Sequence, residues 1–461
     1  MLTHIDAALF RAYDIRGIVG KTLNKEQVFL IGKAFGSFVR EAGEKTVCMA
    51  RDGRLSGPLL AEALCDGLLA VGCEVIDLGM VPTPLLYYAA NQLPSKTGIM
   101  LTGSHNPSEY NGLKMVVQGV TLAEHAIYDL YRRIVEERFF KDEPGTLITQ
   151  PIVERYLHAL TEQIKLARPL KVVLDAGNGV AGAVAPQLFR ALGCIVETLY
   201  CEVDGHFPNH HPDPSDPKNL QDLIEAVRTT HADIGLAFDG DGDRLGVVTN
   251  QGEIIWPDRV LMLYAKALLA TSPQAKIIYD VKCTQHLADY VRQHGGEPFM
   301  WKTGHSLIKT KMRETNALLA GEMSGHFFFK DRFHGGDDAL YAGARLLEIL
   351  AQSSKDSATL FNELPNSINT PELKVAIAEN EKFSFITTLT QHVNTQTQQE
   401  VITLDGLRVH FKEGWGLVRA SNTSPYLILR FEAINHAVLS DIQTLFKTWM
   451  LTINSDLAIP F

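Results

Sequence analysis

The chain has 461 residues, of which 46% are hydrophobic and 21% charged, and its formal net charge at pH 7 is −10. At roughly 150 residues per domain, this length predicts about three domains, each with enough apolar residues for a packed core. The negative charge argues against a nucleic-acid partner, because binding to a phosphate backbone requires a basic surface.

The cysteines and the N-terminal residues indicate the compartment. The six cysteines form no C-x-x-C pair and several stand inside apolar runs, which is typical of buried thiols in a reducing environment. The first residues, "MLTHIDAALFRAYDIRG", lack the basic and apolar segments of a signal peptide, and Lys266 interrupts the most apolar stretch. We therefore expect a cytoplasmic protein with no membrane partner.

Three segments of the chain repeat one order of predicted elements. Each has a strand that ends in a polar turn, a helix that closes on glycine, a second strand, and a later strand that enters a small polar loop. In the first segment these four elements are 46–54, 59–73, 74–80 and 99–105. In the second they are 170–179, 184–194, 195–201 and 234–244, and in the third 275–283, 286–296, 297–304 and 318–326.

Alternating strands and helices predict parallel α/β sheets, in which ligand-binding loops follow the carboxyl ends of strands. The loops centred near Ser104, Asp241 and Ser324 occupy equivalent places in the three segments. We expect them to face one cleft. The alternative is that the repeat reflects only the general alternation of any α/β protein.

From about residue 370 the pattern changes to short strands, with a hairpin turn at Asp405-Gly406, and ends in an amphipathic helix. This pattern predicts a smaller C-terminal α+β domain after three α/β domains. Segments rich in Pro, Gly and Asn mark two of the junctions. The predicted domains are 1–146, 147–254, 255–366 and 367–461.

The segment "FDGDGDRLG" is the most specific local signal. Asp239, Asp241 and Asp243 alternate with glycines and precede Arg244. Carboxylates at this spacing point the same way in an extended segment, and the glycines allow a tight curl around one cation. Carboxylate oxygens suit Mg²⁺, which keeps open positions for a phosphate. The alternative is a solvated acidic turn.

Ser104 lies in "TGSHNP", where serine and glycine could form an ordinary turn. A free hydroxyl is a weak nucleophile, and no G-x-S-x-G elbow surrounds Ser104 or Ser324, which argues against an acyl-transfer hydrolase. If Ser104 instead carries a phosphoryl group, the metal of the acidic loop would coordinate one of its oxygens. Arg244 and Lys114 would then offset the negative charge as the phosphoryl group leaves.

Four other segments fit a phosphosugar, and each has a structural alternative. "VRASNTSP" offers donors for a second phosphate, and "GEMSGH" offers groups for sugar hydroxyls, although either could be a polar turn between strands. "KTGHS" contains Lys302 and His305, where a structural histidine is the alternative. "RAYDIRG" places Tyr13 and Arg16 in a short turn, where a surface salt bridge is the alternative.

Two further motifs resemble known sites. "DAGNGVAG" matches the G-x-G-x-x-G dinucleotide fingerprint, but the equivalent turns of the other two segments lack its glycines, so we interpret it as a tight strand-to-helix turn. "GHFPNHHPDPSDP" contains three histidines, but its prolines impose extended turns and argue against a zinc site.

With "TGSHNP", "DGDGDR", "GEMSGH" and "RASNT" in this order, the sequence resembles the α-D-phosphohexomutase family over essentially the whole chain. Within the family it is most similar to the bacterial enzymes that act on both mannose and glucose phosphates. The resemblance implies three similar α/β domains with mixed sheets and a smaller C-terminal α+β domain, arranged around a central cleft. It also implies one Mg²⁺ per chain and hexose 1,6-bisphosphate as an activator, and we expect a monomer.

The resemblance also implies roles for single residues. Ser104 is the phosphoserine and a metal ligand, together with Asp239, Asp241 and Asp243. The implied catalytic residues are Ser104, His105, Lys114, Arg16, Arg244 and His326, with the general acid or base left open among Lys114, His326 and Arg16. The implied substrate-binding residues are Tyr13, Lys282, His305, Glu322, Ser324, Arg419, Ser421, Asn422 and Thr423.

The implied activity is that of a phosphomannomutase/phosphoglucomutase. The phosphoserine would phosphorylate a hexose 1- or 6-phosphate, and the bisphosphate would turn end for end before its other phosphate returns to Ser104. A phosphoglucosamine mutase, a phosphoserine-dependent sugar phosphatase and a non-catalytic sugar-phosphate sensor are the alternatives.

Overall fold

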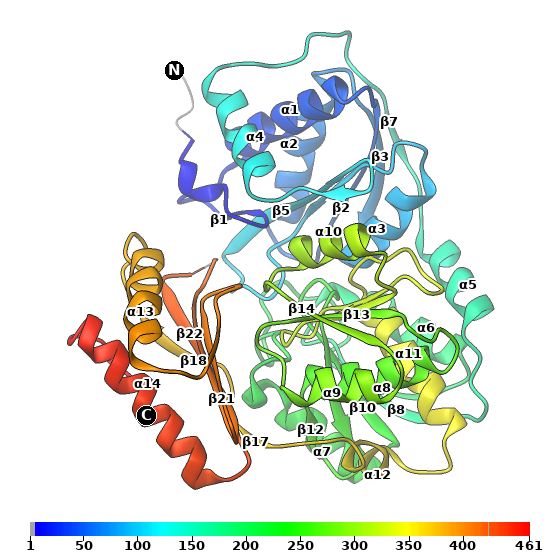
Figure 1. Ribbon diagram of the computed structural model, residues 1–461. Coiled ribbons are helices and arrows are strands. Elements are labelled where there is room, and N and C mark those ends of the chain that lie inside the picture. Colours follow the sequence, from blue (N-terminus) through cyan, green and yellow to red (C-terminus); the bar gives the residue numbers. More distant parts are fainter. Residues whose placement is uncertain (1–4, 423) are drawn as a thin grey trace.

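The computed structural model describes residues 5–422 and 424–461, which form four sheets with helices around them (Figure 1). The first domain contains a seven-stranded sheet in the order β1-β5-β4-β2-β3-β7, with β6 paired to β5. Its strands are β1 (Ile15–Ile18), β2 (Thr46–Arg51), β3 (Glu74–Met80), β4 (Gly98–Leu101), β5 (Tyr110–Val117), β6 (Val120–Thr121) and β7 (Leu147–Thr149). Its helices are η1 (Ala7–Leu9), α1 (Lys25–Glu41), α2 (Gly57–Leu69), α3 (Thr83–Gln92) and α4 (His125–Val135). Because β7 pairs with β3, this sheet extends past residue 146, the predicted junction.

The second domain has a five-stranded sheet in the order β12-β11-β10-β8-β9. Its strands are β8 (Lys171–Asp175), β9 (Ile195–Leu199), β10 (Ile234–Phe238), β11 (Leu245–Thr249) and β12 (Ile254–Ile255). Its helices are α5 (Val153–Gln163), η2 (Val180–Ala183), α6 (Ala185–Ala191), η3 (Pro217–Leu220) and α7 (Gln221–Thr230).

The third domain has a four-stranded sheet in the order β14-β13-β15-β16. Its strands are β13 (Lys276–Asp280), β14 (Glu297–Trp301), β15 (Leu319–Gly321) and β16 (Phe327–Phe329). Its helices are α8 (Pro257–Leu269), α9 (His286–Gln293), α10 (His305–Thr315), α11 (Ala339–Gln352) and α12 (Ser357–Asn362).

The three sheets share one four-stranded core, which confirms the repeat predicted from the sequence. The orders β3-β2-β4-β5, β9-β8-β10-β11 and β14-β13-β15-β16 correspond, with three parallel strands followed by an antiparallel one. The sheets are therefore mixed, as expected. The loops with Ser104, Asp241 and Ser324 follow β4, β10 and β15, the third strand of each core.

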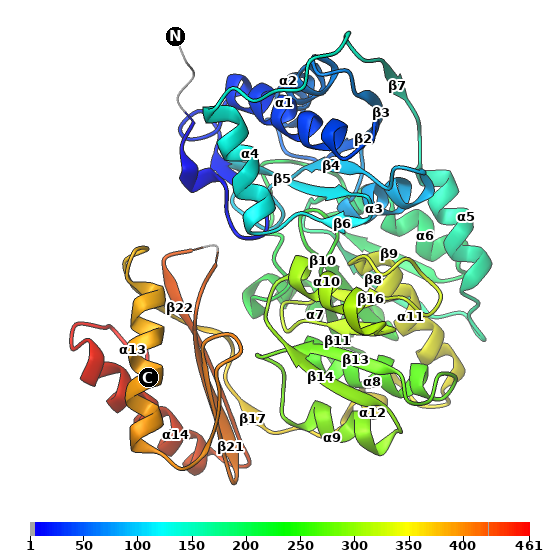
Figure 2. The same ribbon diagram turned by 45° about the horizontal axis from the view of Figure 1, so that its top comes forward.

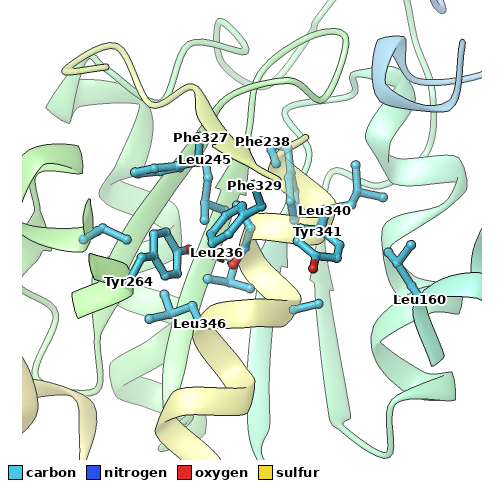
Figure 3. Close-up of a cluster of buried hydrophobic side chains, with 14 of the residues drawn as sticks. Leu160, Leu236, Phe238, Leu245, Tyr264, Phe327, Phe329, Leu340, Tyr341 and Leu346 are labelled. Carbon is cyan, nitrogen blue, oxygen red and sulfur yellow. Dashed lines mark hydrogen bonds between the residues drawn. The ribbon is translucent and has the colours of Figure 1, made fainter. Parts of the chain in front are cut away.

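One hydrophobic core joins the first three domains. Leu85 of α3, Leu236 of β10 and Leu340 of α11 belong to the same buried cluster. Figure 3 shows Leu340, Tyr341 and Leu346 of α11 against Leu236 and Phe238 of the second sheet. Since burial of large apolar side chains is the main favourable contribution to folding, this shared core fixes the three loops relative to one another.

The fourth domain has its own core. Its sheet has the order β17-β22-β21-β20-β19, with β18 paired to β22. Its elements are β17 (Ile368–Asn369), β18 (Leu373–Ala376), α13 (Lys382–Gln396), β19 (Glu400–Ile402), β20 (Leu407–Phe411), β21 (Gly414–Ala420), β22 (Tyr426–Ala433) and α14 (His436–Ile453). Figures 1 and 2 both place α13 and α14 on the side of this sheet away from the other domains.

The third and fourth domains contact each other through polar groups and one apolar cluster. The apolar cluster consists of Val281, Trp415 and Leu417. Arg408, which lies 3.7 Å from the Trp415 ring, donates to the carbonyl oxygens of Val281 and Cys283. Among the helices of the described residues, none is long and apolar enough to cross a bilayer.

Candidate active site

A cleft of about 310 Å³ lies where the four domains meet, and residues from all of them line it. Most of the residues singled out in the sequence are among them: Tyr13, Arg16, Ser104, His105, Lys114, Arg244, Lys282, His305, Glu322, Ser324, His326, Arg419, Ser421 and Asn422. The three aspartates of the acidic loop lie beneath this surface and are fully buried. Thr423 lies outside the described residues.

Ser104 stands in the loop after β4 with its hydroxyl directed toward the second domain. Its backbone has a φ of 49°, and its N–H donates to Thr102 Oγ1 at 2.8 Å. The Ser104 hydroxyl lies 3.1 Å from His105 Nδ1 and donates to Asp239 Oδ2 at 3.1 Å. Gly240 permits this approach, because a Cβ there would lie 2.3 Å from the Ser104 carbonyl oxygen. The hydroxyl therefore faces the acidic loop, close enough for one atom to bridge the two.

A buried arginine holds the shape of the Ser104 loop. Arg54, 1% exposed, pairs with Asp52 at 3.2 Å. Asp52 Oδ2 in turn accepts hydrogen bonds from the Thr102 hydroxyl and the Gly103 N–H. The Arg54 guanidinium also donates to four carbonyl oxygens of the loop, those of Ser104, Asn106, Pro107 and Tyr110, at 2.6 to 2.9 Å. Arg54, Asp52 and the Ser104 carbonyl are buried, and one guanidinium bonds four carbonyl oxygens, so the shape of the loop depends on this cation.

The acidic loop between β10 and β11 brings three carboxylates together. Asp239, Asp241 and Asp243 each offer an oxygen within 4.8 Å of the others. Asp239 Oδ1 accepts the N–H groups of Asp243 and Arg244, which closes the turn. The Oδ1 atoms of Asp241 and Asp243 are buried and have no hydrogen-bond partner among the described residues. Buried carboxylate oxygens of this kind fit the coordination of a divalent cation.

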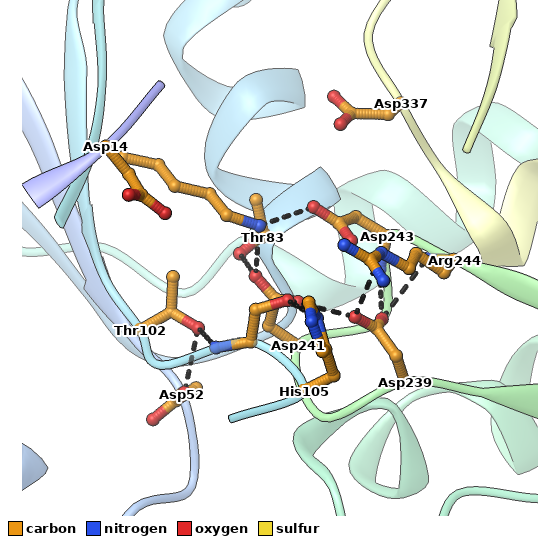
Figure 4. Close-up of polar contacts among 12 residues, drawn as sticks. Asp14, Asp52, Thr83, Thr102, His105, Asp239, Asp241, Asp243, Arg244 and Asp337 are labelled. Atoms are coloured by element: carbon orange, nitrogen blue, oxygen red, sulfur yellow. Dashed lines mark hydrogen bonds and ion pairs between the residues drawn. The ribbon is translucent and has the colours of Figure 1, made fainter. Parts of the chain in front are cut away.

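Lys114 of β5 supplies a positive charge to the same oxygens. Its Nζ lies 2.7 Å from Asp241 Oδ2 and 2.5 Å from Asp243 Oδ2. The Thr83 hydroxyl also donates to Asp241 Oδ2 (Figure 4). Burial alone would disfavour the charged form of both groups, but the attraction between their charges is stronger. The pKa of Lys114 is therefore well above its usual range, and the pKa of Asp241 is lowered. Burial, with the charges of Asp243 and Asp241, raises the pKa of Asp239.

A second network lies on the third-domain side of the cleft. Arg244 Nε donates to His326 Nε2 at 3.1 Å, which assigns the proton of a neutral His326 to Nδ1. That nitrogen lies 3.1 Å from Asp337 Oδ2, and Lys309 Nζ donates to Asp337 Oδ1 at 2.9 Å. The His305 ring stacks on His326 at 5.6 Å. Burial lowers the pKa of His305 well below its usual range, and Lys309 adds to this effect.

The wall formed by the third and fourth domains carries the candidate sugar and phosphate groups. Glu322 Oε1 accepts the Gly304 N–H at 2.5 Å, and burial raises the pKa of Glu322. Arg419 of β21 donates to Asp405 Oδ2 at 3.0 Å, which keeps its guanidinium beside the cleft. Asn422 donates to the Tyr13 hydroxyl, so the fourth domain reaches the first.

The expected turn at Tyr13 and Arg16 is wrong for Arg16. This residue lies in β1, paired antiparallel with β5, and is 9% exposed. It forms an ion pair with Asp14 and donates to Asn106 Oδ1 at 2.5 Å, so the pair is buried and not on the surface. Strand β1 has only four residues, and the first three are buried. It therefore shows no alternation of apolar and polar residues, which is why its sequence indicated a turn.

Sequence analysis missed five polar residues that support the site: Asp52, Arg54, Thr83 and Asp337, which are buried, and Lys309, which is partly buried. Three of them, Asp52, Arg54 and Asp337, lie in segments with a local signal. The "RDGR" turn follows β2 at the same sheet edge as the Ser104 loop, and "GGDD" precedes α11 with a charged pair beside glycines. The other contacts join residues far apart in the chain, which no local pattern reveals.

The two motifs set aside in the sequence have structural roles. In "DAGNGVAG", Gly177 has a φ of 49°, and a Cβ at Gly182 would lie 2.2 Å from the Cys201 carbonyl oxygen. The motif is therefore a tight turn from β8 into η2, as expected. In the histidine-rich loop, His210 Nε2 lies 3.0 Å from Asp175 Oδ2, and no metal-binding group includes its histidines among the residues the structure describes.

Comparisons with known proteins indicate the same family for all four domains of the chain. Models of phosphoglucomutase/phosphomannomutase alpha/beta/alpha domains I, II and III match residues 7–141, 154–252 and 256–368, and the C-terminal domain model matches 372–447. A phosphomannomutase/phosphoglucomutase from Pseudomonas aeruginosa is 55% identical over 457 residues, covering 99% of this chain and 98% of that protein. A phosphoglucomutase from Neisseria meningitidis is 52% identical, covering 97% of each. The crystal structure of a phosphoglucomutase/phosphomannomutase family protein from Burkholderia thailandensis has a TM-score of 0.93 at 51% identity, covering 99% of this chain and 100% of that one.

Proposed function

Because the chain belongs to the phosphoglucomutase/phosphomannomutase family, we propose that its cleft works through a phosphate ester of Ser104. The reaction is the reversible interconversion of the 1- and 6-phosphates of mannose and glucose, and the enzyme is an isomerase that transfers a phosphoryl group within its substrate. The observation that carries the proposed role of Ser104 is its hydrogen bond to Asp239, which directs a buried hydroxyl into an acidic loop.

In the proposed first step, the bond between phosphorus and Ser104 Oγ breaks as the free hydroxyl of a hexose phosphate attacks. A new phosphorus–oxygen bond forms on the sugar, which becomes a 1,6-bisphosphate. The sugar hydroxyl gives its proton to a base, and Ser104 Oγ takes up a proton as it leaves and becomes the free hydroxyl. The bisphosphate then turns end for end within the cleft. Its other phosphate returns to Ser104 by the reverse of the first step, so that no phosphoryl group is gained or lost.

Asp239, Asp241 and Asp243 would hold a metal ion, which we propose is Mg²⁺, with an oxygen of phosphorylated Ser104 as a further ligand. When bound, the ion supplies charge withdrawal from the phosphorus. The unpartnered Oδ1 atoms of Asp241 and Asp243 support this assignment. Lys114 and Arg244 face the same point from two domains and would neutralise the equatorial oxygens during transfer.

We propose His326 as the general base among the three candidates. Arg16 is a guanidinium without a lone pair to accept a proton, and Lys114 Nζ donates to Asp241 and Asp243. His326 is held between Arg244 and Asp337 with both ring nitrogens in contact. A small shift of Arg244 toward the phosphoryl group would free Nε2 to accept the proton.

The far end of the substrate would lie against the third and fourth domains. Arg419, Ser421 and Asn422 line the cleft and offer donors to the phosphate that is not transferred. Thr423 belongs to the same proposed group. Glu322 and Ser324 would bind the sugar hydroxyls, with Lys282 and His305 beside them. Tyr13, His105 and Arg16 complete the proposed set on the first-domain side.

Hexose 1,6-bisphosphate would act as an activator, because it phosphorylates Ser104 in molecules that have lost their phosphoryl group. A monomer in a reducing cytoplasm is a further part of the proposal, consistent with the six free cysteines. The relatives do not favour a glucosamine phosphate mutase or a sensor. A phosphatase would release inorganic phosphate in step with substrate consumption.

Intact-protein mass spectrometry tests the proposed ester. After incubation with glucose 1,6-bisphosphate, the wild-type chain should gain one phosphoryl group and Ser104→Ala should gain none. Ser108→Ala is the matched control, because Ser108 is an exposed hydroxyl of the same loop and should leave the gain unchanged. A phosphoryl group on Ser104→Ala, or none on the wild type, would overturn the proposal.

A further inference from the structure

A second cavity, of about 280 Å³, lies between the first and third domains. Its first-domain walls come from α3 and from the turn between β5 and β6, and its third-domain walls come from α10 and the loop after β16. It shares no lining residue with the cleft that contains Ser104. The volume is near the lower end of the range of small-molecule sites, about 300 Å³, and suits a ligand of one or two phosphate groups.

The lining of this cavity is cationic. Lys96 of the first domain faces Lys309, Arg313 and Lys330 of the third, and no lining residue is an aspartate or glutamate. Within residues 5–422 and 424–461, Lys96, Arg313 and Lys330 form no ion pair. Three cations without an acidic partner, next to Lys309, whose partner Asp337 lies outside the lining, create a local positive potential in a chain of net charge −10. An anion that bridges the two domains would neutralise it.

Uncharged polar side chains complete the lining, and two of them carry an atom that is buried too deeply to face the cavity. The Tyr87 hydroxyl oxygen and His334 Nε2 form no hydrogen bond with any residue that the structure describes. The side-chain amides of Asn91 and Gln118 lie in the same lining. From the cations gathered around this cavity, we infer that it binds a phosphate-bearing small molecule.

Lys309 connects this cavity to the active site. Its Nζ lies 4.2 Å from the centre of the Tyr87 ring and donates to Asp337 Oδ1 at 2.9 Å. Asp337 Oδ2 lies 3.1 Å from His326 Nδ1. An anion in the cavity attracts Lys309 away from Asp337 and loosens the group that orients His326. Occupancy of the cavity therefore lowers turnover without blocking the cleft, a consequence that rests on the proposed role of His326.

Binding is tested without turnover, by isothermal titration of the Ser104→Ala/Arg419→Ala chain with inorganic pyrophosphate in the absence of divalent metal. Loss of Arg419 weakens the phosphate site of the cleft, so one equivalent of pyrophosphate should still bind, in the second cavity. Adding Lys96→Glu and Lys330→Glu should weaken that binding roughly tenfold or more, because two attractive charges become repulsive. Adding Lys21→Glu and Lys165→Glu instead, two exposed lysines outside the cavity, is the matched control and should leave it unchanged.

Turnover is measured separately in the chain with Ser104 intact, at saturating Mg²⁺. Pyrophosphate should lower kcat for glucose 1-phosphate, and Lys96→Glu/Lys330→Glu should remove this effect while keeping the uninhibited rate. Equal pyrophosphate binding by the cavity and control variants would overturn the inference. Purely competitive inhibition, equal in both, would also overturn it. Because the titration needs no phosphoserine, it stands or fails independently of the proposed reaction.

Discussion

The ammonium group of Lys114 lies 2.7 Å from Asp241 Oδ2, so a cation of the first domain is held inside the acidic loop of the second. Asp243 Oδ2 is 2.5 Å from the same nitrogen. A divalent ion on this loop would be attracted by the oxygens that Lys114 contacts. The lysine and the metal are therefore expected to compete for them, and this competition sets how tightly the loop binds metal.

Lys114→Met should bind Mg²⁺ more tightly than the wild type, by roughly tenfold, because the competing charge is gone. Its turnover should fall by roughly a hundredfold, since the lysine no longer neutralises the transferring group. Isothermal titration gives the first quantity and steady-state kinetics the second. Lys282→Met is the control, because Lys282 lines the cleft but pairs with Glu372 and not with the acidic loop. Weaker Mg²⁺ binding by Lys114→Met would contradict the competition.

Arg54→Ala should destabilise the first domain by about 3 to 5 kcal/mol, because it leaves Asp52 as a buried charge without its partner and strips four loop carbonyls of a donor. The Ser104 loop should also accept phosphate more slowly. Urea denaturation followed by circular dichroism measures the loss. Arg138→Ala removes a half-exposed arginine of the same domain and should cost less than about 1 kcal/mol. Equal losses in the two variants would show that Arg54 does not support the loop.

The sequence predicted the parts of the site that depend on local pattern. The loops after β4, β10 and β15 were found because strand periodicity and the spacing of glycines and acids are readable within ten residues. Their approach to one another follows from the repeated core, since equivalent loops leave equivalent strand ends.

Local pattern could mark some of the supporting residues but not the contacts that they make. Asp337 acts on His326 through space and on Lys309 across 28 residues, and Asn422 meets Tyr13 across 409. Neither residue type is unusual where it stands. The burial of Arg16 was missed for a related reason: its strand is flanked by chain that arrives from elsewhere in the fold. Tertiary contact decides such positions, and composition does not.

Asp338 gives the folded chain a specific pH dependence. It caps α11 and accepts from the Tyr156 hydroxyl at 2.8 Å, and burial raises its pKa from 3.8 to about 7. A raised pKa means that the folded state favours the protonated form. The stabilisation of the folded state by protonated Asp338 is complete below pH 3.8 and is lost as the pH rises toward 7.

Asp338→Asn, which stays neutral, should therefore gain stability relative to the wild type as the pH rises through this range, by up to about 1.4 kcal/mol per pH unit. Urea denaturation at several pH values measures the difference. Asp356→Asn is the control. Asp356 caps α12 on the surface, and hydrogen bonds from the Thr359 N–H lower its pKa, so its contribution is lost only in acid. Parallel pH profiles for the wild type and Asp338→Asn would contradict the assignment.

The proposed sugar contacts explain how one cleft can act on both mannose and glucose phosphates. The two sugars differ only in configuration at C2, and the substrate must bind in two orientations. Glu322 and Ser324, on the loop after β15, line one side of the cleft and would contact the 3- and 4-hydroxyls in either orientation. Glu322 is 2% exposed and keeps the Gly304 N–H on Oε1, so a substrate lacking the partner hydroxyl leaves the other oxygen of a buried carboxylate without a donor. We therefore expect 2-deoxyglucose 1-phosphate to keep kcat/KM within about tenfold of glucose 1-phosphate, and 3-deoxyglucose 1-phosphate to lose roughly a hundredfold or more. Coupled assays with equal concentrations of the two analogues measure both ratios. A loss for the 2-deoxy sugar as large as that for the 3-deoxy sugar would mean that the cleft does contact C2, and tolerance of both hexoses would then need two distinct binding modes.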